Sequence, residues 1–116
     1  MSKFDIIKKI TSNRSYSLLE EHLHEDFMLI REEGLVMREE FLSYVKDHFE
    51  ENGNYQIRIL DLKLKFEDEE SLVWQDLFDT NDGKRFTTTT YEAYKDGKCW
   101  RQMMTKKAVG KDIDKL

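Results

Sequence analysis

Residues 71–105, with the sequence SLVWQDLFDTNDGKRFTTTTYEAYKDGKCWRQMMT, decide the fold. Three segments within this stretch, 71–79, 84–95 and 98–105, are rich in β-branched and aromatic residues and predict strands. The first two segments are separated by Asn-Asp-Gly and the last two by Asp-Gly, which are typical of the tight turns in β-hairpins. The stretch therefore predicts an antiparallel meander of long strands.

The preceding segment, residues 55–66, predicts a further strand that contains an irregularity. Its apolar positions alternate with polar ones, but they slip from odd to even numbers between Ile59 and Leu62. A one-residue slip of this kind is what a β-bulge produces. We therefore expect a bulge at Leu60-Asp61.

The first half of the chain is predicted to be helical, apart from one short strand. Apolar residues recur at helical spacing in three segments, which begin after Ser2, after Ser15 or Ser17, and over residues 37–51. Residues 27–31 are short, apolar and capable of forming a strand. Helices followed by an antiparallel meander predict an α+β fold with the helices on one face of a curved sheet.

Length, charge and cysteine content restrict the class of protein. The 116 residues predict a single domain over 1–116, with the tail 107–116 as a candidate for disorder. The net charge of −5, without a stripe of Lys and Arg, argues against a nucleic-acid partner and against an anionic membrane surface. No apolar run approaches the roughly 18 residues of a membrane span. The lone cysteine and the lack of an apolar signal segment in residues 1–11 predict a cytoplasmic protein.

Two stretches carry a family resemblance. Residues 23–27, Leu-His-Glu-Asp-Phe, precede a glycine and a helix, and residues 89–101 run from Thr-Thr-Tyr to Asp-Gly-Lys-Cys-Trp-Arg. With the order of predicted elements over about residues 2–107, they resemble the nuclear-transport-factor-2-like superfamily, in particular its polyketide-cyclase-like and uncharacterised small bacterial single-domain proteins. The resemblance implies a cone-shaped, cystatin-like α+β fold. In it, about three N-terminal helices pack on the concave face of a curved, mostly antiparallel β-sheet.

The chain departs from this family on the last strand. Many relatives carry a His-Gln pair there, where this sequence has Met103, Met104 and Thr105. No role of that histidine can be carried over to this chain.

The cone fold leaves a cavity between the helices and the concave sheet face, and polar residues on apolar faces are the candidates to line it. Asp76 shares a strand face with Leu72, Trp74 and Phe78. A carboxyl group among large apolar side chains has a raised pKa, which suits general-base chemistry near neutral pH. Trp74 would supply an apolar wall beside it. If the opposite face of the strand points inward instead, Asp76 is a solvated surface residue.

Four further residues are candidate ligand contacts. His48 and Tyr44 share a face of the third predicted helix and could close the cavity, with a structural role as the alternative for both. Glu92 could neighbour Asp76 across the sheet. Alternatively, Glu92 forms a cross-strand ion pair with Arg101, which we favour because such pairs are common and acid dyads are rare.

No motif for a metal or a cofactor is present, so we expect neither. The sequence lacks the glycine-rich phosphate-binding patterns and the His-Glu-x-x-His zinc motif. His22 and His24 would lie about 200° apart on a helix and cannot bind one metal ion together. Cys99 has no cysteine or histidine partner at ligand spacing.

Three functions remain open at this point. We expect first a protein that binds a small apolar molecule in the cone cavity. The alternatives are an isomerase-, cyclase- or dehydratase-type enzyme with Asp76 or His48 as general base, and a dimeric assembly domain with a vestigial cavity.

A homodimer through the β-sheet is expected as well. Both faces of the predicted strands carry apolar residues, and one layer of helices covers only one of them. Members of the superfamily commonly form dimers through this surface, and the resemblance implies the same here.

Overall fold

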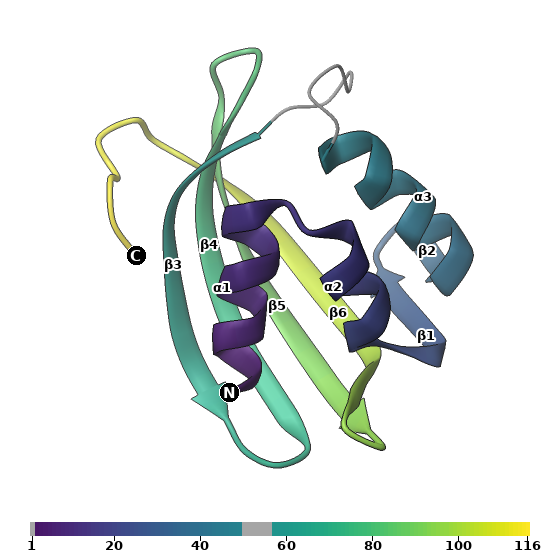
Figure 1. Cartoon of the computed structure of the whole chain (residues 1–116). Helices are drawn as coiled ribbons and strands as arrows, with labels where there is room; N and C mark the ends of the chain where they lie inside the picture. The colour runs from purple at the N-terminus through teal and green to yellow at the C-terminus, as the bar shows by residue number, and fades with distance from the viewer. Residues whose placement is uncertain (1, 50–56) are drawn as a thin grey trace.

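The computed structural model of the chain describes residues 2–49 and 57–116 (Figure 1). The described elements are, in order, α1 (Lys3–Asn13), α2 (Tyr16–His22), β1 (Leu23–Arg31), β2 (Gly34–Met37), α3 (Arg38–Phe49), β3 (Ile57–Glu67), β4 (Ser71–Thr80), β5 (Arg85–Lys95) and β6 (Lys98–Val109). Helices thus precede a meander of four long strands, as the sequence predicts for an α+β fold.

The first two helices begin at serine caps. The Ser2 Oγ accepts a hydrogen bond from the Asp5 N–H, and the Ser15 Oγ accepts one from the Leu18 N–H. Each cap satisfies a backbone donor that the first turn of a helix leaves without a partner. The predicted start of α1 is confirmed, and α2 uses Ser15 rather than Ser17.

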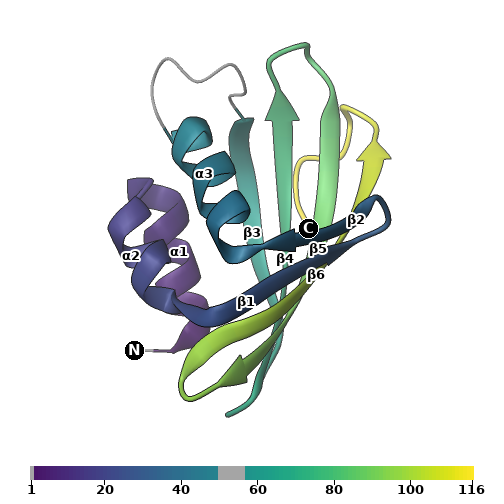
Figure 2. The same cartoon turned by 90° about the vertical axis from the view of Figure 1, so that its right-hand side faces the viewer.

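The described strands form one curved sheet in the order β2-β1-β6-β5-β4-β3. β1 and β6 pair in parallel, and the other neighbours pair antiparallel. The three helices lie on one side of the sheet, which curves around them (Figures 1 and 2). The β3–β4 register shifts between Ile59 and Asp61, which confirms the bulge predicted at Leu60-Asp61.

The core identifies the inward face of β4. Leu72 and Trp74 are buried and pack in one cluster with side chains of the helices and of β1, among them Leu42 and Phe27. β4 and β5 pair without a register shift, so the alternation of side chains along β4 is unbroken. Asp76, two residues beyond Trp74, therefore points to the same inward face. Of the two orientations that the sequence allows, the structure has the inward one.

A β-hairpin before α3 differs from the prediction. The strand expected at residues 27–31 starts at Leu23 and pairs with β2 after a turn at Gly34, whose φ of 135° favours glycine. β2 has four residues, too few for a periodic pattern to reveal. After this hairpin, α3 begins at Arg38, close to the helix start expected at about residue 37. The predicted end of this helix at residue 51 and the predicted strand start at residue 55 lie outside the described residues.

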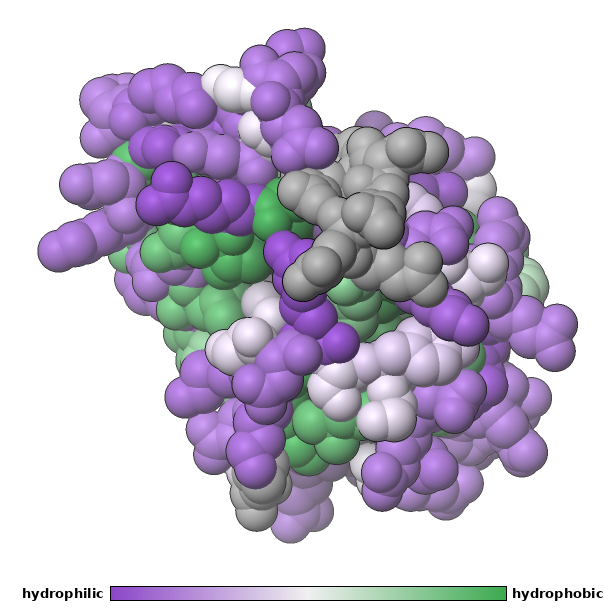
Figure 3. All heavy atoms as spheres, turned by 45° about the horizontal axis from the view of Figure 1, so that its top comes forward, coloured by the Kyte–Doolittle hydropathy of each residue, from purple (hydrophilic) through white to green (hydrophobic). Residues whose placement is uncertain are grey.

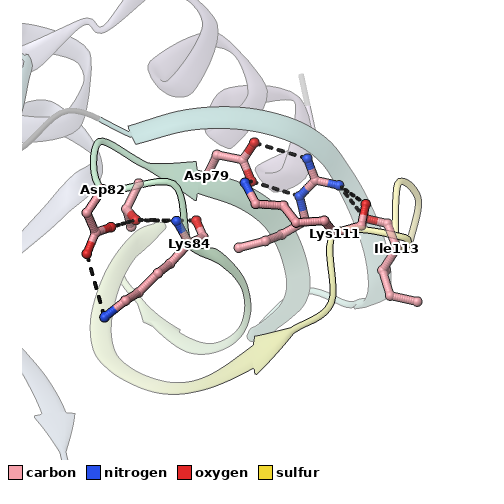
Figure 4. Close-up of polar contacts among 7 residues, drawn as sticks. Asp79, Asp82, Lys84, Lys111 and Ile113 are labelled. Carbon is pink, nitrogen blue, oxygen red and sulfur yellow. Dashed lines mark hydrogen bonds and ion pairs between the residues drawn. The ribbon is translucent and has the colours of Figure 1, made fainter.

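The C-terminal tail, a candidate for disorder in the sequence, is attached to the sheet. β6 continues to Val109, and the Arg85 guanidinium donates hydrogen bonds to the carbonyls of Lys111 and Ile113 (Figure 4). The Leu116 N–H donates to the Asp61 carboxylate. The sequence could not reveal these contacts because they join residues that are far apart in the chain.

Within residues 2–49 and 57–116, no helix has the length and apolar character needed to cross a membrane.

Candidate functional site

An open cavity of about 800 Å³ lies where α1 and α3 end and the β4–β5 turn begins. Its described lining residues are Thr11, Ser12, Arg14, His48, Phe49, Ile57, Arg58, Ile59, Leu62, Asp76, Asp79, Thr80, Asn81, Gly83 and Lys111. Figure 3 looks toward this end of the molecule and shows apolar surface bordered by hydrophilic side chains. The volume falls in the range of roughly 300–1,000 Å³ that small-molecule sites occupy.

The cavity combines an apolar wall with a polar rim. Ile57, Ile59 and Leu62 of β3 contribute aliphatic side chains to the lining. Arg14, at the end of α1, and Lys111, in the tail, contribute cations. A ligand in this cavity would bury its apolar body against β3 and meet charged groups nearer the solvent.

Asp76 is a half-buried carboxyl group in this lining. It lies opposite Leu62 on β3 and opposite Thr88 on β5. The Thr88 hydroxyl donates a hydrogen bond to its Oδ1. Burial raises the pKa of Asp76, and the hydrogen bonds from Thr88 oppose that rise only in part. The sequence predicts a raised pKa for Asp76 because its strand face is apolar, and burial is the main cause of the rise in the structure.

His48 reaches the same cavity from α3. Burial lowers the pKa of its imidazole, and the nearby Arg14 guanidinium lowers it further. The Tyr44 ring stacks on the His48 ring, with a centroid distance of 5.9 Å and an interplanar angle of 20°. Tyr44 itself is half exposed and is not among the described lining residues, so the ligand contact expected for it stays a prediction.

The shifts in pKa at Asp76 and His48 run in opposite directions and favour the uncharged form of each group. A neutral carboxyl group can donate a proton or a hydrogen bond, and a neutral imidazole can accept one. The cavity lining therefore includes two titratable side chains that favour their uncharged forms, one from the sheet and one from a helix.

Trp74 and Glu92 face inward but lie deeper than the cavity lining. Both are buried, and neither is among the lining residues. Glu92 accepts hydrogen bonds from the Tyr94 hydroxyl at 3.1 Å, the Cys99 thiol at 3.3 Å and the Gln102 amide at 2.7 Å. Burial raises the pKa of Glu92 against these hydrogen bonds.

Arg101 does not form the ion pair that we favoured for Glu92. The β5–β6 register places Gln102 opposite Glu92, so Arg101, the adjacent residue, is directed to the other face of the sheet. Its guanidinium donates to the Asp26 carbonyl at 2.8 Å and lies 3.8 Å from the centre of the Trp100 ring. Arg101 is therefore a surface contact and not a cavity residue.

The charged rim of the cavity was not predicted from the sequence. Arg85 donates to the two carboxylate oxygens of Asp79 at 2.7 and 3.0 Å, and the Lys111 ammonium lies 3.6 Å from the same carboxylate (Figure 4). The Arg85 hydrogen bonds are the main reason that the pKa of Asp79 is lowered. This cluster joins β4, β5 and the tail, so no local sequence pattern predicts it.

The two histidines before and within β1 serve separate contacts. His22 Nε2 lies 2.9 Å from the Tyr94 hydroxyl, and burial lowers the pKa of His22 to about 4. His24 Nε2 lies 3.6 Å from the Asp96 carboxylate. In the part of the chain that the structure describes, no three His, Cys, Asp or Glu side chains come together as a candidate metal site.

Comparison with known proteins identifies the fold. No protein-family model and no curated protein matches the chain in sequence. Solved structures do match in shape. A ketosteroid isomerase-like protein from Kribbella flavida superposes with a TM-score of 0.68 at 16% identity, over 92% of this chain and 78% of its own.

Two further structures give the same result. A SnoaL-like polyketide-cyclase-like protein from Mesorhizobium loti has a TM-score of 0.69 at 12% identity, over 87% of this chain and 92% of its own. An NTF2-like protein from Anabaena variabilis has a TM-score of 0.64 at 16% identity, over 97% of this chain and 87% of its own. At these identities the likeness establishes the fold and leaves the chemistry to the site.

Proposed function

We propose that this chain, whose fold is that of the NTF2-like proteins, binds a small, largely apolar molecule in the cavity that Asp76 and His48 line. The main support for this proposal is the cavity itself. It is of ligand size, it has an aliphatic wall on β3, and its lining includes the half-buried Asp76 carboxyl group. An apolar ligand with one hydrogen-bonding group would match this arrangement.

The test is a matched pair of cavity variants. Leu62 points into the cavity, and its neighbour Lys63 is exposed on the other face of β3. Titration of the uncharged fluorophore N-phenyl-1-naphthylamine should show saturable binding to the wild type and to Lys63→Trp. Leu62→Trp fills the cavity and should weaken binding at least about tenfold. Equal affinity in the two variants would contradict the cavity as the site.

Catalysis through Asp76 is the second candidate function. Asp76, whose pKa is raised, and His48, whose pKa is lowered, line one cavity and both favour their uncharged forms, so the pair offers a proton donor and a proton acceptor for general acid–base chemistry. Proteins described as isomerase-like and cyclase-like share the fold, which is compatible with catalysis in this cavity. Asp76→Asn should abolish any turnover while the variant still binds the fluorophore.

A homodimer through the sheet is the third element of the proposal. The outward face carries an apolar row that crosses all six strands. Its members, which lie opposite one another in register, are Phe66, Val73, Tyr91, Met103, Ile30 and Leu35. Phe66, Tyr91, Met103 and Leu35 are each 43–56% exposed in the single chain. A contiguous exposed row of this kind indicates a contact surface, and a second copy of the chain would cover it.

The assembly-domain alternative differs from these proposals in its outcome. An assembly domain is supported if the dimer forms and the fluorophore does not bind. We expect the protein to act in the cytoplasm, in keeping with a buried thiol at Cys99 that has no disulfide partner.

A further inference from the structure

The inward-facing residues of β5 are polar along its buried length. Thr88, Thr90, Glu92 and Tyr94 are exposed by only 5%, 0%, 4% and 9%. The side chains packed around them are those of the apolar core. A run of polar residues at such positions opposes folding unless each one is hydrogen-bonded, so this run is a candidate for a functional role.

Both ends of the run are hydrogen-bonded. At the cavity end, Thr88 donates to Asp76. At the deep end, Glu92 accepts from the Tyr94 hydroxyl, which lies 2.9 Å from His22 Nε2, and from the Gln102 amide. These contacts account for three of the four inward residues.

The middle of the run is different. Thr90 Oγ1, Trp74 Nε1 and Gln102 Oε1 are buried and have no hydrogen bond of good geometry among the described residues, although the Trp74 N–H is near enough to the Glu92 carboxyl group to help lower its pKa. The three side chains are neighbours on the inward face. Trp74 lies directly opposite Thr90, and Gln102 lies opposite Glu92, the next inward residue of β5. Each unpaired polar atom is destabilising, and three in one place point to a missing common partner.

The three unpaired atoms lie deeper in the fold than the cavity lining. Trp74 and Thr90 are each two residues from Asp76 and Thr88, which is about 7 Å along a strand. Met104 on β6 lies opposite Thr90, is partly buried and packs against the core. Its unbranched side chain can change rotamer at little cost. A ligand in the cavity would reach the three atoms only if a neighbouring side chain moved, and Met104 is the adjacent inward side chain of β6.

We propose that Trp74, Thr90 and Gln102 form a deep subsite that receives an uncharged hydroxyl group of the molecule bound in the cavity. The Trp74 indole N–H can only donate, the free Gln102 oxygen can only accept, and the Thr90 hydroxyl can do either. A hydroxyl group both donates and accepts and so satisfies all three. The Glu92 carboxyl group accepts a hydrogen bond from Gln102 beside these atoms, so a carboxylate ligand would be placed next to another acid. The inference rests on the proposed binding function.

The test compares two probes of similar shape, 2-naphthol and 2-methylnaphthalene, by calorimetric titration. The wild type should bind 2-naphthol about tenfold more tightly. Thr90→Val keeps the shape of the side chain and removes its hydroxyl. It should bind the two probes equally, through weaker binding of 2-naphthol and unchanged binding of 2-methylnaphthalene. Trp74→Phe should have the same effect.

The control is Thr89→Val. Thr89 faces the other side of the sheet, where it accepts a hydrogen bond from Gln75, and its variant should keep the preference for 2-naphthol. Thermal unfolding adds a second readout. Because the Thr90 hydroxyl is unpaired, Thr90→Val should unfold at the wild-type temperature or above it.

The outcomes separate the two proposals. If both probes bind the wild type with equal affinity, or if Thr90→Val keeps the preference, the deep subsite is refuted while cavity binding stands. If Thr90→Val unfolds at a lower temperature and keeps the preference, the hydroxyl is purely structural. If neither probe binds the wild type, the proposed function fails and the subsite fails with it.

Discussion

Gln102, not Arg101, lies opposite Glu92 across β5 and β6, and its amide donates a hydrogen bond of 2.7 Å to the Glu92 carboxyl group. This register position determines whether the Glu92 carboxyl group lies beside a cation or beside uncharged partners. With Arg101, Glu92 would be half of a surface ion pair. With Gln102, Cys99 and Tyr94 as its partners, it is an acid in a buried and uncharged environment.

The first prediction concerns the pH dependence of stability. Burial raises the pKa of Glu92 above its ordinary value of 4.5, so the folded protein loses stability as the pH rises through the native pKa. Glu92→Gln cannot ionise and escapes this loss. Its free energy of unfolding relative to the wild type should therefore increase by about 1 kcal/mol or more between pH 4 and pH 8. Denaturant melts across this range measure the difference.

Glu25→Gln is the matched control, because Glu25 is exposed on β1. The change with pH in the stability of Glu92→Gln relative to the wild type should exceed that in this control. A difference between Glu92→Gln and the wild type that does not change with pH would contradict the raised pKa of Glu92.

The second prediction concerns the Asp76 carboxyl group. The Thr88 hydroxyl donates to this carboxyl group, whereas the Thr87 hydroxyl donates to the Asp76 backbone carbonyl. Thr88→Val should raise the pKa of Asp76 further, because the hydrogen bond that opposes the effect of burial is lost. Thr87→Val should leave it unchanged. Carboxyl carbon shifts followed by NMR during a pH titration compare the variants, and identical Asp76 curves would argue against the contact.

The β-strands and their turns could be predicted from the sequence because their patterns are local. The Asn-Asp-Gly and Asp-Gly turns, and the parity slip that marks the bulge at Leu60-Asp61, each lie within a few residues. The sequence alone allows Asp76 to point either inward or outward, and the side of the sheet on which the helices pack decides between the two. The partner of Glu92 and the Arg85 contacts depend on register and on tail placement, which join distant residues and leave no local pattern.

The third prediction concerns the tail. Arg85 joins Asp79 to the carbonyls of Lys111 and Ile113 (Figure 4). Arg85→Met should release residues 111–116, and their amide hydrogens should exchange at least about tenfold faster. Lys84→Met removes the neighbouring cation, which pairs with exposed Asp82, and should leave this exchange unchanged. Slow exchange in Arg85→Met would mean that other contacts hold the tail.

The fourth prediction concerns the dimer. Tyr91 and Met103 lie opposite each other at the centre of the outward apolar row. Tyr91→Lys places a charge in the proposed contact and should raise the dimer dissociation constant at least about tenfold. Tyr44→Lys, an exposed tyrosine changed on the helical side, should leave it unaltered. Sedimentation velocity reports both, and a monomeric wild type at micromolar concentration would refute the dimer.

Chemical-shift mapping by NMR tests the central claim, ligand binding in the cavity, most directly. We predict that titration of N-phenyl-1-naphthylamine moves the resonances of Ile59, Leu62 and Asp76, which line the cavity, to one saturable end point. The resonances of Tyr91 and Met103 on the outward face should remain in place. Shifts confined to the outward apolar row, or no saturable shifts at all, would contradict the claim.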